Sequence, residues 1–102
     1  MQVQQASVPF GPVSGSGPQV QSTTVTFPSP VTQAVAILTG FTAEYSGNND
    51  HHLGQLDVQV VVPAGGITGA TVTVQVTYGL RDQDTNFDDQ YDGQVFFAVV
   101  GE

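Results

Sequence analysis

The sequence predicts an all-β protein, an antiparallel β-sandwich of about six strands, and three observations lead to this fold class. Apolar residues alternate with polar ones in several separate segments, which is typical of strands that are buried on one face. No segment keeps an apolar stripe at helical spacing, and β-branched residues dominate the apolar runs. The 12 Gly and 6 Pro make the chain too rich in turn formers for a helical bundle. Antiparallel strands of this kind must cover one another's apolar faces, so two packed sheets are expected.

The first two strands are expected at residues 23–27 and 33–45. The shorter strand ends at Pro28, because proline cannot donate to a ladder hydrogen bond. In the longer strand, Gly40 is expected to mark a bulge or bend. Simple alternation divides its apolar residues into one face with Val35, Ile37, Phe41 and Tyr45 and another with Ala34, Ala36 and Leu38.

Three further strands are expected at residues 56–62, 71–78 and 93–100. The first two of these are joined by a hairpin with Gly65 and Gly66 at its tip. The last is apolar on both faces, so we expect it to be central, or to lie with one face on the core and the other on another subunit. The predicted core contains Ile37, Phe41, Leu56, Val58, Val60, Val62, Val72, Val74, Val76, Tyr78, Phe97 and Val99.

Residues 1–21 are predicted to be a flexible arm that precedes a sandwich domain at residues 22–102. Gly and Pro interrupt this segment every few residues, and the only element it favours is a short strand at residues 2–8. A chain of 102 residues is long enough for one domain of ordinary size.

The charge balance excludes several classes of function. Nine acidic residues stand against one basic residue, Arg81, and the formal net charge is −8. Such a surface repels nucleic-acid phosphates and anionic membranes, and no apolar run reaches the roughly 18 residues of a membrane helix. The absence of Lys and Cys excludes Schiff-base and thiol chemistry. A single site for trypsin-like proteases favours an extracellular or particle-associated protein.

An acidic loop between the last two strands, residues 81–93, holds five of the nine acids. Oxygen-bearing side chains recur there at every second position, the spacing at which an EF-hand loop offers ligands to calcium. Phe87 replaces the EF-hand glycine and Gly93 replaces its closing glutamate, so the alternatives are a calcium site of another type and a solvated loop with Asp and Asn in turns. The candidate metal ligands are Asp82, Asp84, Asn86, Asp88, Asp89 and Asp50.

A second polar cluster lies at residues 46–53. His51 and His52 are adjacent and point to opposite sides of an extended chain, so at most one of them is a ligand. Asp50, His52 and a carboxylate of the acidic loop would make a zinc or calcium site or an acid–base pair, and the alternative is a polar turn.

Catalysis is not expected. The chain has no Gly-x-Ser-x-Gly nucleophile motif, and a sandwich of about 100 residues has little room for the cleft of a two-carboxylate glycosidase. Loops at the end of a sandwich present polar groups to a partner with little effect on the core, so a binding or structural role is predicted instead.

Residues 25–42 resemble the opening of H-type lectin domains: a short strand that ends at Phe27 is followed by a proline-containing turn and a long aliphatic strand. The later strands follow in the order of that family, so the resemblance covers residues 22–100. It implies an antiparallel sandwich that assembles as a trimer and binds a sugar such as N-acetylgalactosamine near the subunit boundary. The family's Trp-His pair after the penultimate strand is replaced here by Leu80 and Arg81, which leaves the sugar specificity open.

The leading hypothesis is a non-catalytic carbohydrate-binding module that forms oligomers through a face with Phe96, Ala98 and Val100. One alternative is an assembly module of a secreted particle or a phage-tail-like structure, and another is a module whose calcium ion only orders the acidic loop. The candidate sugar-binding residues are Arg81, Asp84, Asn86, Tyr91, Asn49 and His52.

Overall fold

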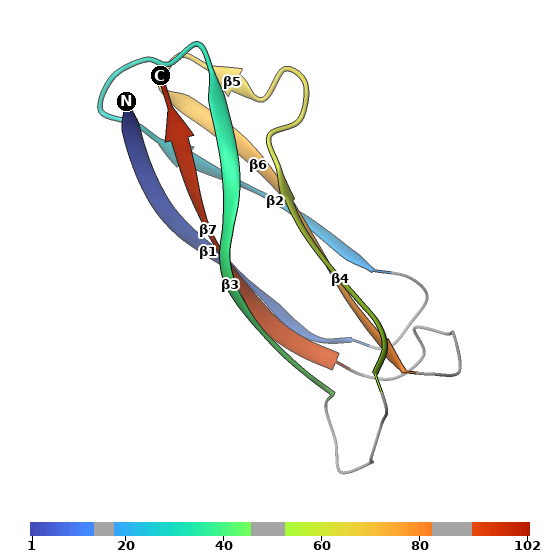
Figure 1. Ribbon diagram of the computed structural model, residues 1–102. Helices are drawn as coiled ribbons and strands as arrows, with labels where there is room; N and C mark the ends of the chain where they lie inside the picture. Colours follow the sequence, from blue (N-terminus) through green and yellow to red (C-terminus); the bar gives the residue numbers. More distant parts are fainter. Residues whose placement is uncertain (14–17, 46–52, 83–90) are drawn as a thin grey trace.

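The computed structural model describes residues 1–13, 18–45, 53–82 and 91–102. All regular secondary structure in these ranges is β-strand, and the strands form two antiparallel sheets that pack on each other (Figure 1). The predicted all-β sandwich is therefore confirmed.

Each sheet has three long strands, and the central one in each is a predicted core strand. The first sheet has the order β1 (Gln2–Val13), β7 (Tyr91–Gly101) and β3 (Ala34–Tyr45). The second sheet has the order β2 (Gln19–Thr26), β6 (Thr71–Asp82) and β4 (Leu53–Val61), and the short strand β5 (Ile67–Thr68) also pairs with β6. The central position predicted for the last strand is confirmed, because β7 pairs with both β1 and β3.

The prediction that residues 1–21 form a flexible arm is wrong for the part of that segment that the structure describes. Strand β1 pairs with β7 from Gln2 onward, and its Val8 and Phe10 are buried in the core. The inward positions nearer the N-terminus hold Gln4 and Ala6, so the apolar alternation of this strand is weak. Its prolines are tolerated because β1 is an edge strand.

The bulge predicted at Gly40 is confirmed by a shift in the pairing of β3 with β7 between Leu38 and Gly40. A bulge reverses the alternation of faces, so the residues before and after it do not share the faces that simple counting gives. Before the bulge, Ala36 packs against the core whereas Val35 and Ile37 point to solvent. The prediction of Ile37 as a core residue is therefore wrong.

After the bulge, the odd-numbered residues of β3 pair with inward residues of β7. Phe41 pairs with Val95, and Tyr45 pairs with Tyr91. Tyr45 packs against the core, but Phe41 remains exposed because β3 is an edge strand. The prediction that Phe41 is buried is also wrong.

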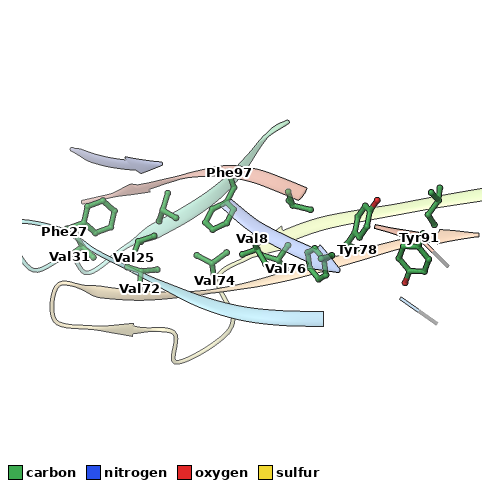
Figure 2. Packing of buried hydrophobic residues seen from close by; sticks show 14 residues of the cluster. Val8, Val25, Phe27, Val31, Val72, Val74, Val76, Tyr78, Tyr91 and Phe97 are labelled. Carbon is green, nitrogen blue, oxygen red and sulfur yellow. The ribbon is translucent and has the colours of Figure 1, made fainter. Parts of the chain in front are cut away.

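The core is centred on the two middle strands, β6 and β7 (Figure 2). Val72, Val74, Val76 and Tyr78 of β6 are fully buried, as predicted, and they face Val95, Phe97 and Val99 of β7. The predicted core residues Leu56, Val58 and Val60 are only partly buried, because β4 is an edge strand, and Val62, which follows β4, is partly buried as well.

The turn predicted around Gly65 and Gly66 is present. The amide of Gly66 donates to the carbonyl of Pro63 at 2.9 Å, and Gly65 has a φ of 77°. This left-handed conformation suits glycine because other residues carry a Cβ that crowds the backbone.

Candidate functional site

The side of the first sheet that faces away from the core carries a group of apolar side chains. We call this group the outer apolar face and define it by Val3, Val35, Ile37, Phe96, Ala98 and Val100. Its four largest exposed members have exposed fractions of 52% for Val3, 60% for Val35, 47% for Ile37 and 38% for Phe96. The outer apolar face thus extends the predicted apolar surface of Phe96, Ala98 and Val100 onto both neighbouring strands.

The pairing of the strands places these side chains in rows across the sheet, because directly paired residues share a face. Val100 of β7 lies between Val3 of β1 and Val35 of β3. In the next row, Ala98 lies between Gln5 and Ile37, and in the third row Phe96 lies between Ser7 and Gly40. The apolar side chains are therefore contiguous over three strands.

The same face becomes polar and then acidic toward the other end of the sheet. The side-chain amide of Gln94 donates to the Ser7 hydroxyl at 3.0 Å, and its backbone amide donates to the Thr42 hydroxyl at 3.1 Å. Two residues further on, Asp92 pairs with Glu44. The apolar rows thus lie between Asp92 and Glu44 at one end of the face and Glu102, which follows Val100 by two residues and pairs with Gln33, at the other.

Strand β7 explains why apolar residues point outward. Its odd-numbered residues Val95, Phe97 and Val99 fill the core, so the even-numbered residues must lie on the outer surface. Polar residues at these positions would stabilise a solvated surface, but this chain has Phe96, Ala98 and Val100. A sheet that is apolar on both sides is expected where a second layer covers it.

The outer surface of the second sheet provides an internal comparison. Its central strand β6 presents Thr71, Thr73, Gln75 and Thr77 there, a composition typical of a solvated sheet surface. Val20 and Val61 are exposed on that surface, but they lie on the two edge strands with β6 between them. A continuous, exposed apolar surface is therefore found on the outer side of the first sheet and not on that of the second.

Of the predicted sugar-binding residues, Arg81 is placed near the end of β6. Its guanidinium donates to the side-chain oxygen of Gln55 on β4, through Nε at 3.0 Å and through Nη2 at 2.8 Å. Two donors on one acceptor hold the guanidinium in a defined orientation on the outer side of the second sheet. Four other predicted sugar-binding residues lie outside the described residues: Asn49, His52, Asp84 and Asn86.

The candidate metal ligands Asp50, Asp84, Asn86, Asp88 and Asp89 also lie outside the described residues. Asp82 ends β6, and the structure describes its backbone only. Among the side chains that are described, no three from His, Cys, Asp and Glu are grouped as a metal ion would require.

The prediction that Tyr91 binds a ligand is wrong. Its side chain is only 1% exposed and packs edge-on against Tyr78, with the ring centroids 5.6 Å apart. Tyr91 has the same odd-numbered alternation as Val95 on β7, and this pattern in the sequence already indicated an inward side chain.

Sequence reasoning missed Val3, Val35 and Ile37 as members of the outer apolar face. Val3 fell in the segment predicted to be an arm, and the other two were placed on the same face as Phe41. For Val35 and Ile37 the signal is the glycine at position 40, because a bulge there reverses the faces.

Within the described part of the chain, no helix has the length and apolar character needed to span a membrane. Comparison of the chain with family models, curated proteins and solved structures finds no match. The resemblance to H-type lectin domains therefore stays a prediction.

Proposed function

We propose that this chain is a non-catalytic assembly module that associates with a second copy of itself through the outer apolar face. The observation that supports the proposal best is that the apolar side chains of this face adjoin one another across three paired strands. Val3, Val35, Ile37 and Phe96 are exposed, and they surround Ala98 and Val100. Large apolar patches on a soluble protein mark surfaces that another molecule covers.

The size of the face limits the strength of a contact between two copies. The apolar rows extend over five residues of β7, from Phe96 to Val100, at roughly 3.3 Å each, and over three strands about 4.8 Å apart, which gives a surface of roughly 15 Å by 15 Å. Two such surfaces bury on the order of 500 Å² in total, which is less than a stable interface buries, so the contact is weak or extends to Gln94 and Glu102. We therefore expect a weak, reversible dimer.

The charge distribution favours this face for contact between identical chains. Each copy has a formal net charge of −8, so most of its surface repels a second copy. The apolar rows contain no charged residue; Asp92 and Glu44 lie at one end of the same face, and Glu102 lies beyond Val100 at the other. The apolar rows between these acids are thus the part of this face that a second acidic chain approaches with least repulsion.

Polar substitutions of exposed residues test the proposal. Ile37→Gln and Phe96→Gln place an amide in the contact and should shift the mass in solution from twice 10.7 kDa toward 10.7 kDa. Val20→Gln and Val61→Gln are matched controls, because those valines have similar exposed fractions, 55% and 46%, on the other sheet. Thermal melts of all four variants should resemble that of the parent chain.

Light scattering at several protein concentrations gives the masses. A single-chain mass for the parent protein at all concentrations up to the millimolar range would contradict the proposal. Equal loss of association in the face variants and in the control variants would contradict the choice of this face.

A further inference from the structure

We infer that the two copies are related by a twofold axis that crosses the strands at the level of Ala98, so that β7 of one copy runs antiparallel over β7 of the other. This inference rests on the proposed function and defines how the two faces meet. It follows from where the face carries charge and from the sizes of the side chains in each row.

Two kinds of twofold axis place one outer face on another. An axis parallel to the strands puts Asp92 of one copy opposite Asp92 of the other, with one Glu44 on each side of this pair, and puts Glu102 opposite Glu102. An axis across the strands puts the two Asp92 residues at opposite ends of the dimer and places Glu102 opposite Gln94. Asp92 is six residues from Ala98, so the second arrangement separates the two Asp92 residues by roughly 40 Å.

Electrostatics therefore selects the axis across the strands. The axis along the strands opposes the Asp92 carboxylates of the two copies, which repel each other, whereas the axis across the strands leaves them roughly 40 Å apart, well beyond the Debye length of about 8 Å at physiological ionic strength. The chain has one basic residue, Arg81, and it lies on the other sheet, so it cannot neutralise a shared acidic end.

The sizes of the side chains select the level of Ala98. With the axis there, Ala98 lies opposite Ala98 of the second copy, and these small side chains let the central strands approach. Phe96 then lies opposite Val100, and Val35 lies opposite Gly40, whereas Ile37 in the row of Ala98 meets Ile37 of the second copy. All six residues of the outer apolar face are covered in this arrangement.

Axes at neighbouring levels fit less well. An axis at Phe96 puts the two phenylalanines against each other and places Val100 opposite Asp92, which buries a carboxylate against an apolar side chain. An axis at Val100 places Glu102 of each copy opposite Ala98 of the other, which buries a carboxylate against an apolar side chain. The level of Ala98 is the one that covers the apolar rows and places Glu102 opposite the polar Gln94.

Single-cysteine crosslinking tests the arrangement, because the chain has no cysteine of its own. Gln5 is exposed on the edge strand β1, in the row of Ala98, so the axis across the strands places it opposite Gln5 of the second copy. Gln5→Cys should therefore give a covalent dimer in high yield with a bis-maleimide whose spacer spans about 8 Å. Thr24→Cys, exposed on the other sheet, gives the background from random collisions.

Asp92→Cys distinguishes the two axes. The axis across the strands predicts that this variant crosslinks no more than Thr24→Cys, whereas the axis along the strands places its two thiols together. Crosslinking of Asp92→Cys without crosslinking of Gln5→Cys would overturn the inferred arrangement. The inferred arrangement would also be overturned if neither variant crosslinked more than Thr24→Cys in samples that light scattering shows to be dimeric. A single-chain mass for the parent protein would instead refute the proposed function itself.

Discussion

The hydroxyl of Tyr78 donates a hydrogen bond of 2.7 Å to the backbone carbonyl of Asp92, and this bond connects the two sheets. The same hydroxyl lies 3.3 Å from the carbonyl of Thr42 on the neighbouring strand. Gly93 makes this approach possible, because a Cβ at that position would collide with the Tyr78 hydroxyl and with the Thr42 carbonyl. The polar tip of a buried ring thus joins β6 to β7 and β3.

Replacement of Tyr78 by Phe keeps the ring and removes the donor. The carbonyl of Asp92 then loses a hydrogen bond in a buried setting, so we expect a loss of about 1–2 kcal/mol in the free energy of unfolding. Urea titration followed by circular dichroism measures this change. Thr24→Ala, at an exposed position, should change the free energy of unfolding by less than about 0.5 kcal/mol. Equal midpoints for Tyr78→Phe and the parent chain would show that the bond contributes nothing.

The stability of the protein should fall in alkaline solution. Burial raises the pKa of Tyr78 from 10.0 to about 12, and the negative charge of Asp92 adds to the effect. Because the folded pKa lies above the unfolded one, this stabilisation is complete below pH 10 and is lost as the pH rises through about 12. Melting temperatures measured between pH 8 and 12 should decline above pH 10, and Tyr78→Phe should decline less. Identical declines in both proteins would contradict this assignment.

Phe10→Ala tests whether β1 is part of the core. The Phe10 ring is buried 5.2 Å from the ring of Tyr78, centroid to centroid. Truncation of a buried phenylalanine costs about 3–5 kcal/mol, so we expect a large drop in the urea midpoint. Thr24→Ala, exposed on the other sheet, should leave the midpoint unchanged. A midpoint for Phe10→Ala close to that of the parent chain would mean that this segment behaves as an arm in solution.

The carbohydrate-binding prediction can be tested separately from assembly. A glycan array probed in millimolar calcium and again in chelator shows whether the chain binds a sugar and whether an ion takes part. If it binds, Arg81→Ala should abolish the signal, and Gln55→Ala should weaken it because Gln55 orients the guanidinium. Silence of the parent chain under both conditions would contradict sugar binding and leave the assembly proposal intact.

Much of the fold could be predicted from the sequence, because β6 and β7 alternate strongly. The runs around Val74 and Phe97 identify two strands and their inward residues, and both runs are central in the structure. The predicted apolar outer surface at Phe96 and Ala98 follows from the same alternation. Where polar and apolar residues alternate regularly along a strand, the local pattern is sufficient to assign each side chain to one face of the sheet.

The remaining features depend on contacts that the pattern does not contain. Strand β1 has Gln4 and Ala6 at inward positions, so only its pairing with β7 makes it a strand of the core. The bulge at Gly40 was predicted, but its consequence, the reversal of faces that exposes Ile37, depends on the register with β7. Because of these two features, the sequence pattern does not identify Val3, Val35 and Ile37 as members of the outer apolar face.

The mass of the parent chain in solution tests the central claim most directly. Sedimentation equilibrium at increasing protein concentration should show a reversible rise from 10.7 kDa to twice that mass, and Ile37→Gln should shift the rise to higher concentration. A mass of 10.7 kDa at every concentration, for a chain that melts cooperatively, would contradict the claim that the outer apolar face joins two copies.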